Sequence, residues 1–253
     1  MRSRWVLVLV ASAVLLASVG VAAVLWWPRS GKTETVTPDP GPQGTVMLIP
    51  GYGGGTESLQ LLRRKLQRKG ISVEIVGIGN GEGDLRVYAA KVDRRARQLV
   101  RKGQPPADLI GYSAGGVIAR IAASESPDLF RRVVTLATPH EGTGLADLGA
   151  AGGMCPTACQ QLRPGSNLLA NLPDPATRDL WLSVYSGTDD VILPPASSEL
   201  SGARIVRIQD YCSGTVSHSQ VPTNPQAIAS VLAFLAGSAI VADCGDAGVG
   251  ATT

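Results

Sequence analysis

The sequence has few aromatic residues, only two histidines and only four cysteines. Aromatic residues make up 4% of its 253 residues, which argues against a surface on which the bases of single-stranded nucleic acid would stack. The net charge is only +3, and the basic residues are spread over several segments. Because the chain has no single-sign block, nucleic-acid motif or repeat, we do not expect nucleic acid as a partner.

The four cysteines form neither a Cys-x-x-Cys motif nor a group with histidine, so the sequence predicts no zinc site and implies no other metal or organic cofactor. An even cysteine count in an exported chain indicates two disulfides. We expect Cys155–Cys159, which closes a tight local loop, and Cys212–Cys244, which would tie the last stretch of chain to the body of the protein.

The N-terminal residues 1–27 carry an apolar run, Trp5 to Trp27, that contains no charge. At about 1.5 Å per residue it is just long enough to cross a bilayer core of about 30 Å. It is either an uncleaved signal anchor with interfacial tryptophans, which we favour, or a secretory signal cut near Val21-Ala22-Ala23. In either case we expect an extracytoplasmic domain, anchored to the membrane by residues 5–27 or secreted. Residues 28–43 are rich in Pro, Thr and Gly and form a linker.

Residues 44–237 alternate between apolar strand patterns and helical patterns. Strands are expected at 45–50, 71–75, 108–110, 132–137, 180–186 and 203–208. Thr56 and Asp84 are candidate N-caps of the helices that follow the first two strands. Such alternation predicts right-handed βαβ crossovers and a mostly parallel sheet with helices on both faces, an α/β domain. Residues 144–178 are less regular, and residues 238–253 form a loosely held tail tied by Cys244.

The third strand ends abruptly in Gly111-Tyr112-Ser113-Ala114-Gly115 and a helical pattern begins at once. A Gly-x-Ser-x-Gly sequence on a tight strand-to-helix turn exposes the serine hydroxyl and needs glycine where a Cβ would clash. The N-terminus of the following helix directs its N–H groups towards any anion formed beside the serine. Ser113 is therefore the candidate nucleophile.

A serine nucleophile needs a base, normally histidine, that a carboxylate orients. On this type of fold the acid and then the base follow the serine in the chain, each after a strand. His140 precedes any suitable acid, so His218 is the candidate base. Asp189 and Asp190 both follow the strand at 180–186; Asp189 is nearer to the strand end and is preferred, but Asp190 stays open.

The oxyanion of a tetrahedral intermediate needs two backbone N–H donors. Ala114 follows the nucleophile and supplies one. The loop after the first strand, Gly51-Tyr52-Gly53, supplies the other, for which we choose Tyr52.

These motifs resemble those of the small bacterial lipase/esterase family of α/β-hydrolases, especially the secreted actinobacterial triacylglycerol-lipase-like proteins. The resemblance covers roughly residues 44–237 and rests on five motifs: Ile49-Pro50-Gly51-Tyr52-Gly53-Gly54, Gly111 to Gly116, Thr138-Pro139-His140-Glu141-Gly142-Thr143, Tyr185 to Asp190, and Ser217-His218. It implies an α/β-hydrolase of minimal type without a large lid domain, with Ser113 as nucleophile, Asp189 as acid, His218 as base, and Tyr52 and Ala114 as oxyanion donors.

The sequence departs from the family pattern at two positions. Pro50-Gly51 stands where the family usually has His-Gly, and Tyr112 stands where it usually has histidine before the nucleophile. Neither position supplies triad chemistry. In the Thr-Pro-His motif we expect a structural role, with His140 bonding within its own loop.

Three functions fit this constellation. The leading hypothesis is a carboxylic-ester hydrolase (lipase or esterase) that forms an acyl-enzyme on Ser113. The second is an acyltransferase to a cell-envelope acceptor, which would use the same triad. The third is a catalytically silent binding protein on the same fold, which would be expected to lack one of the three triad residues. We expect a monomer that acts on an ester or lipid.

Overall fold

A six-stranded parallel sheet forms the centre of the domain. The computed structural model describes residues 41–245, so the expected anchor or signal and most of the expected linker lie outside the described residues. The strand order is β2-β1-β3-β4-β5-β6 and every neighbouring pair is parallel. The strands are β1 (Val46–Ile49), β2 (Val73–Ile75), β3 (Ala107–Tyr112), β4 (Phe130–Leu136), β5 (Trp181–Tyr185) and β6 (Arg204–Arg207).

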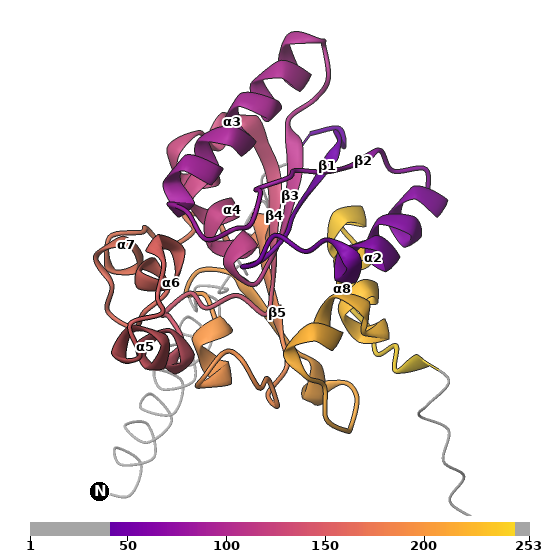
Figure 1. Cartoon of the computed structure of the whole chain (residues 1–253). Coiled ribbons are helices and arrows are strands. Elements are labelled where there is room, and N and C mark those ends of the chain that lie inside the picture. The colour runs from indigo at the N-terminus through magenta and orange to yellow at the C-terminus, as the bar shows by residue number, and fades with distance from the viewer. Residues whose placement is uncertain (1–40, 246–253) are drawn as a thin grey trace, which may run out of the picture. The chain divides into compact units, whose positions relative to one another are not determined.

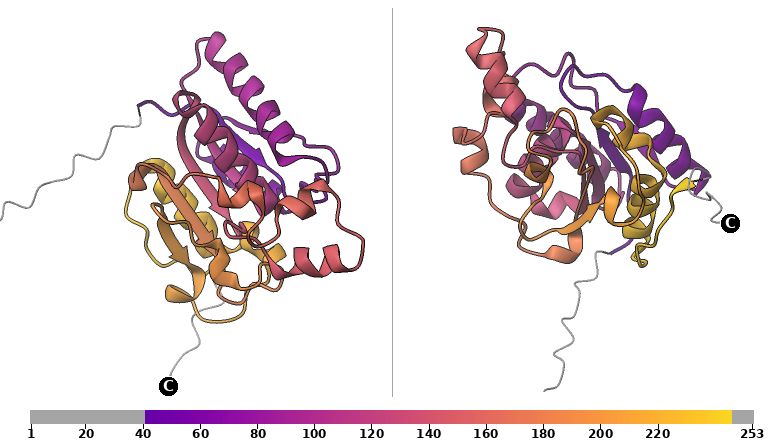
Figure 2. Two further views of the ribbon diagram at one scale, coloured as in Figure 1. Left: turned by 90° about the vertical axis from the view of Figure 1, so that its left-hand side faces the viewer. Right: turned by 90° about the horizontal axis from the view of Figure 1, so that it is seen from below.

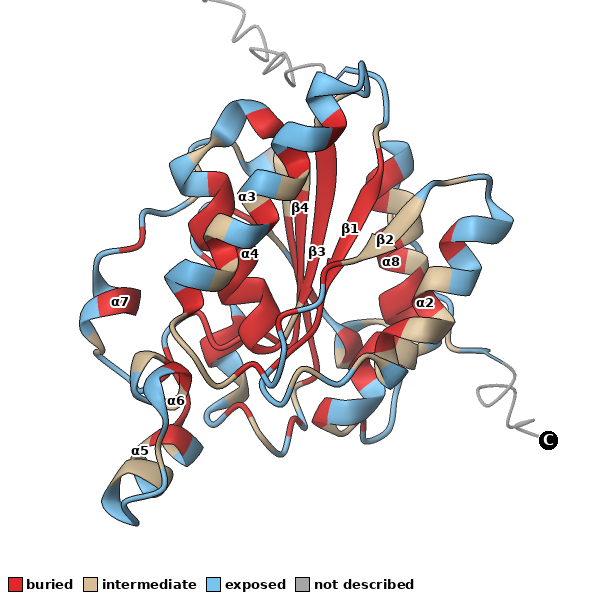
Figure 3. Cartoon of the chain, turned by 45° about the horizontal axis from the view of Figure 1, so that its top comes forward, coloured by how far each residue is buried: buried red, intermediate tan, exposed pale blue. Residues whose placement is uncertain are grey.

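Helices cover both faces of the sheet (Figures 1 and 2). One face carries α3 (Leu85–Arg101) and α4 (Ala114–Glu125), and the other carries α2 (Glu57–Arg68) and α8 (Pro225–Ala236). Strand residues alternate between the two layers: Met47 and Ile49 pack with α3 and α4, whereas Val46 and Leu48 pack with α2 and α8. All four are fully buried (Figure 3), as expected for a parallel sheet enclosed by helices. The α/β fold predicted from the sequence is confirmed.

Three short helices follow β4 in the segment that the sequence pattern left irregular. They are α5 (Gly144–Ala151), α6 (Thr157–Gln161) and α7 (Asn167–Ala170). Their buried leucines and alanines join the apolar layer of α3 and α4, so this segment is an appendage of one face and not a large lid domain. Short 3-10 segments complete the fold: Pro127–Leu129, Arg178–Leu180, Pro195–Ser198, Ile208–Asp210 and His218–Thr223.

Local signals at helix starts were only partly predictive. The carboxylate of Asp84 accepts a hydrogen bond from the N–H of Arg86 at 2.9 Å and caps α3 as expected. Thr56 occupies the N-cap position of α2 as expected, but its side chain makes no capping hydrogen bond. Within residues 41–245, no helix combines the length and the apolar character that a membrane span requires.

A buried ion pair fixes the start of β3. Arg131 at the start of β4 donates two hydrogen bonds to Asp108, at 2.9 and 2.6 Å. Burial raises the pKa of Asp108, and Arg131 opposes that rise. Asp108 lies at the edge of the sheet opposite to the carboxyl ends of the strands, so this pair serves the fold.

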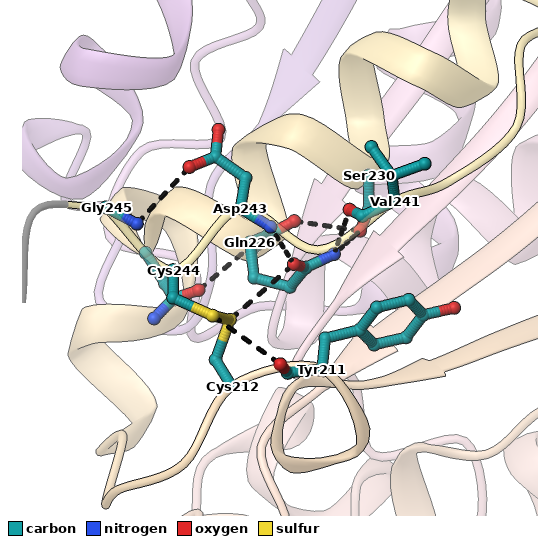
Figure 4. The surroundings of a disulfide bond; sticks show 10 residues. Tyr211, Cys212, Gln226, Ser230, Val241, Asp243, Cys244 and Gly245 are labelled. Carbon is teal, nitrogen blue, oxygen red and sulfur yellow. Dashed lines mark hydrogen bonds between the residues drawn. A yellow bond between two sulfur atoms is a disulfide. The ribbon is translucent and has the colours of Figure 1, made fainter. Parts of the chain in front are cut away.

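Two disulfides form with the pairing expected from the sequence, Cys155–Cys159 and Cys212–Cys244. The second ties the described part of the C-terminal tail to the segment after β6 (Figure 4). The buried side chain of Gln226 on α8 strengthens this attachment, because its amide oxygen accepts from the N–H of Asp243 at 2.7 Å and its amide nitrogen donates to the carbonyl of Val241 at 3.2 Å (Figure 4). The described tail, residues 238–245, is therefore held at two points.

The side chain of His140 is buried directly after β4. Its Nε2 lies 3.0 Å from the hydroxyl of Thr135, and its backbone N–H donates to the carbonyl of Ser197 at 2.8 Å. Its Nδ1 is buried and has no hydrogen-bond partner among the described residues. The backbone N–H of His140 also donates to the carbonyl of Thr138 at 2.9 Å, so the residue bonds within its own loop through its main chain, as predicted, whereas its ring bonds back to strand β4.

We predict that the two disulfides contribute unequally to stability. Replacing Cys212 and Cys244 by serine opens a loop with a sequence separation of 32, and loop-closure entropy gives a loss of about 4 kcal/mol in the free energy of unfolding. Replacing Cys155 and Cys159, separated by 4, should cost about 2 kcal/mol. Denaturant titration of both double variants measures the difference. An equal or larger loss for the short loop would contradict this prediction.

We also predict that His140 destabilises the fold in acid. Burial, assisted by Arg120, lowers its pKa from 6.5 to about 3. Between these values the unfolded chain binds a proton that the folded chain does not, so stability falls as the pH decreases, by up to about 1.4 kcal/mol per pH unit. His140→Gln should flatten the pH dependence of the free energy of unfolding between pH 6.5 and 4.5 relative to the parent. Thr135→Val, which keeps the imidazole, is the control, and parallel curves for parent and His140→Gln would disprove the assignment.

Candidate active site

The residues selected from the sequence gather at one edge of the sheet. Because all the strands are parallel, their carboxyl ends lie at the same edge, where ligands of open α/β sheets bind. Tyr52 follows β1, Ser113 follows β3, Asp189 follows β5 and His218 follows β6. Residues that are up to 166 positions apart, Tyr52 and His218, therefore share this edge.

Ser113 occupies a strained backbone conformation between β3 and α4. Its φ of 54° and ψ of −125° lie outside the regions that residues with a side chain normally adopt. The flanking glycines explain how this turn is accommodated. A Cβ on Gly111 would lie 2.3 Å from the carbonyl oxygen of Gly115, and a Cβ on Gly115 would lie 2.3 Å from that of Ile49. Strand and helix can approach this closely only without those side chains.

The N-terminus of α4 begins at Ala114, directly after the serine. The first N–H groups of a helix lack intrahelical acceptors, and the helix dipole favours negative charge at this end. The backbone beside the Ser113 hydroxyl can therefore stabilise an anion. Ser113 is 9% exposed, so the residue is largely buried but still accessible.

The loop after β1 passes directly against the serine. A Cβ on Gly51 would come within 2.9 Å of the Cβ of Ser113. The N–H of Gly54 donates to the carbonyl of Gly51 at 3.0 Å and closes a tight turn around Tyr52. The Tyr52 side chain is exposed, so the turn presents backbone towards Ser113 and its phenol to solvent.

His218 and Asp189 form a buried acid–base pair. The Nδ1 of His218 lies 2.9 and 3.1 Å from the two carboxylate oxygens of Asp189. The N–H groups of Val191 and Ile192 donate to the same carboxylate at 2.9 and 2.8 Å. With Nδ1 of His218 directed at this carboxylate, Nε2 is the ring nitrogen left to act on a substrate or nucleophile.

The neighbouring Asp190 has a different partner. Its carboxylate accepts a hydrogen bond from the backbone N–H of His218 at 2.8 Å. That bond is the main reason why the pKa of Asp190 is lowered. Of the two aspartates that the sequence left open, Asp189 thus contacts the imidazole and Asp190 contacts the main chain of the same histidine.

Sequence reasoning missed the contact between Tyr112 and His218. The two rings pack with centroids 5.1 Å apart, and the Tyr112 hydroxyl donates to the carbonyl of His218 at 3.3 Å. Burial, with Asp189 and Asp190 nearby, raises the pKa of Tyr112 above its ordinary value, so the phenol remains a neutral donor. Its position directly before the nucleophile was the one available signal.

Among the residues that the structure describes, no group of three or more His, Cys, Asp or Glu side chains could hold a metal ion.

Comparison with known proteins places this geometry in a family context. Residues 44–154 match the family model described as the alpha/beta hydrolase fold. A triacylglycerol lipase of Pseudarthrobacter phenanthrenivorans is 32% identical over 117 residues, which cover 40% of this chain and 35% of the lipase. A triacylglycerol lipase of Burkholderia plantarii is 29% identical over 117 residues, covering 40% of this chain and 31% of that protein. This chain thus spans about a third of the length of the curated relatives it matches.

Solved structures support the fold independently. The mature form of the Bacillus licheniformis lipase BlEst2 superposes with a TM-score of 0.62 and 15% identity, covering 79% of this chain and 94% of that one. Aspergillus fumigatus lipase B gives a TM-score of 0.65 and 17% identity over 77% of this chain and 52% of that one. At such identities the likeness concerns the fold. Sequence and structure together show that the chain has the α/β-hydrolase fold and that part of it is similar to bacterial triacylglycerol lipases.

Proposed function

We propose that the protein is a serine carboxylic-ester hydrolase of the lipase/esterase type. The observation that best supports this proposal is the His218–Asp189 pair, which lies at the same sheet edge as the strained Ser113. Ester hydrolysis is further supported by the similarity to triacylglycerol lipases. We assign Ser113 as nucleophile, His218 as base, Asp189 as acid, and the N–H groups of Ala114 and Tyr52 as oxyanion donors.

In the proposed reaction, Nε2 of His218 removes the hydroxyl proton as the Ser113 oxygen attacks the ester carbonyl. The carbonyl oxygen becomes an oxyanion that the N–H groups of Ala114 and Tyr52 stabilise. The carbon–oxygen bond to the alcohol then breaks, and His218 returns the proton to the leaving alcohol. Water, activated by the same imidazole, cleaves the acyl-enzyme, releasing the acid and restoring Ser113. Asp189 stays ionised throughout and stabilises the imidazolium.

The substrate class follows from the environment of the site. The segment between β4 and β5 holds the short helices α5, α6 and α7, of eight, five and four residues, and the 3-10 turn Arg178–Leu180. We infer that no large lid must open before an ester reaches Ser113. Soluble short or medium esters are therefore proposed as substrates beside lipids.

We propose that the domain works outside the cytoplasm, attached to the membrane or released, as the apolar run Trp5 to Trp27 suggests. The two disulfides support this, because such bonds form and persist in oxidising compartments.

The triad assignment predicts large and selective losses of activity. In the full chain, solubilised in detergent, Ser113→Ala and His218→Ala should each lower kcat on p-nitrophenyl esters by about 10⁴-fold or more, and Asp189→Asn by about 10⁴-fold. Ser201→Ala, at an exposed serine, is the matched control and should keep parental turnover. The acyl-chain optimum of the parent would then separate esterase from lipase.

Two outcomes would count against ester hydrolysis as the function. If the parent shows no turnover and Ser113 does not react with a fluorophosphonate probe, the hydrolase proposal fails. If the probe labels Ser113 but no ester is hydrolysed, the nucleophile is competent and the natural reaction is acyl transfer to a specific acceptor.

The compartment proposal is tested with a membrane-permeant thiol reagent. In intact cells of the native host, we expect none of the four cysteines to be alkylated before reduction, and all four afterwards, as read by mass spectrometry of the protein. Alkylation of Cys212 and Cys244 without a reductant would contradict an extracytoplasmic domain.

A further inference from the structure

The segment that carries His218 has little regular structure of its own. It runs from the end of the 3-10 turn Ile208–Asp210 to the start of the next, His218–Thr223. The backbone bonds at its beginning, from the N–H groups of Tyr211 and Cys212, both go to the carbonyl of Ile208. Ser217 is held within the following turn, because its N–H donates to the side chain of Gln220 at 2.9 Å, whereas Val216 and the N–H of His218 bond to other segments.

These hydrogen bonds to Val216 and His218 come from the side chains of three residues close to Asp189 in the chain: Ser186, Thr188 and Asp190. The N–H of Val216 donates to the Thr188 hydroxyl at 2.9 Å. The carbonyl of Val216 accepts from the hydroxyls of Ser186 at 2.6 Å and Thr188 at 3.2 Å. Two residues later, the N–H of His218 donates to Asp190 at 2.8 Å. The loop after β5 thus holds both the backbone and the ring of the histidine-bearing segment.

Gln209 joins the same two loops where they leave the sheet. Its amide oxygen accepts from the N–H of Gly187 at 2.7 Å, and its amide nitrogen donates to the Ser186 hydroxyl at 3.1 Å. The network is continuous from the ends of β5 and β6 to His218. It fixes the spacing between the two loops independently of the imidazole–carboxylate contact.

From this arrangement we infer that Asp190 is a positioning residue. Through its hydrogen bond to the backbone N–H of His218, and together with Thr188, it holds the base in the orientation that keeps its imidazole on Asp189 and its Nε2 towards Ser113. This inference rests on the proposed function for its catalytic consequence, whereas the positioning itself concerns the structure of the loop. The two aspartates then divide the work: Asp189 orients the ring, and Asp190 orients the main chain that carries it.

The exposure of Asp190 makes its role separable from stability. Asp189 is 4% exposed, so its replacement disturbs a buried site, whereas Asp190 is exposed and its replacement opens no cavity. Its neighbouring titratable groups are His218, which helps to lower the pKa of Asp190, and Tyr112, whose pKa it helps to raise. Asn at position 190 keeps an oxygen that can accept the His218 N–H but removes the charge, so the variant pair separates hydrogen bonding from electrostatics.

The experiment compares Asp190→Ala, Asp190→Asn and Thr188→Val with the parent in the full chain. We expect Asp190→Ala to lower kcat on a p-nitrophenyl ester by about 10- to 100-fold, as for a small misplacement of a catalytic group, with KM and Tm nearly unchanged. Asp190→Asn should keep most of the parent kcat. Thr188→Val should also lower kcat. In the double variant Asp190→Ala/Thr188→Val, the fold-loss in kcat should be smaller than the product of the two single losses, because both residues act on one loop. Asp210→Ala, at an exposed aspartate whose carboxylate lies 3.8 Å from the guanidinium of Arg207, is the control.

A second measurement does not depend on activity. Amide hydrogen exchange should become faster at residues 216–218 in Asp190→Ala and Thr188→Val but not in Asp210→Ala. Unchanged exchange there, a kcat within about twofold of the parent for Asp190→Ala, or equal losses for Asp190→Ala and Asp190→Asn would overturn the inference. If Ser113→Ala and Asp189→Asn retain turnover while the exchange result stands, the proposed catalytic function fails and the positioning of His218 by Asp190 survives.

Discussion

The close approach of β3 and α4 at Gly111 and Gly115 is the constraint on which the site depends. Because neither residue has a side chain, the helix starts within one residue of the strand end, and Ser113 between them takes a positive φ. The same closeness brings the loop after β1 against the serine, since Gly51 lies where a Cβ would touch it. One steric condition thus aligns the candidate nucleophile, the helix N-terminus and the second candidate oxyanion donor. The buried contacts of the surrounding strands offset the free-energy cost of the strained backbone at Ser113.

Much of this organisation could be read from local sequence. Apolar runs separated by helical patterns predicted the parallel sheet. The Gly-x-Ser-x-Gly turn indicated Ser113, and chain order then indicated the aspartate pair and His218. The cysteine pairs were also predictable, because only one pairing gave a local loop and a long-range tie. What these features share is that they depend on residue type and spacing, both of which are visible without coordinates.

The features that sequence did not predict are tertiary contacts. Nothing in the spacing of Tyr112 and His218 indicates that their rings pack, since 106 positions separate them. The ring of His140 is hydrogen-bonded to the hydroxyl of Thr135 on β4 and not to a group of its own loop, because the chain turns back after β4. Thr56 has a capping residue's identity but not its geometry. Asp189 and Asp190 are chemically identical neighbours. Only the path of the loop that carries His218 decides which of the two carboxylates contacts the imidazole ring.

The attachment of the C-terminal segment affects the order in which the parts of the candidate active site are held in place during synthesis. Cys212 lies six residues before His218, and its disulfide partner, Cys244, is near the end of the described chain. Val241 and Asp243, which bond to Gln226, also follow the whole sheet and the serine turn in the chain. A chain still emerging from the ribosome or a translocation pore can therefore complete its sheet and its serine turn before the segment carrying its base is secured. The attachment of that part of the candidate active site is therefore coupled to the synthesis and oxidation of the segment that carries Cys244.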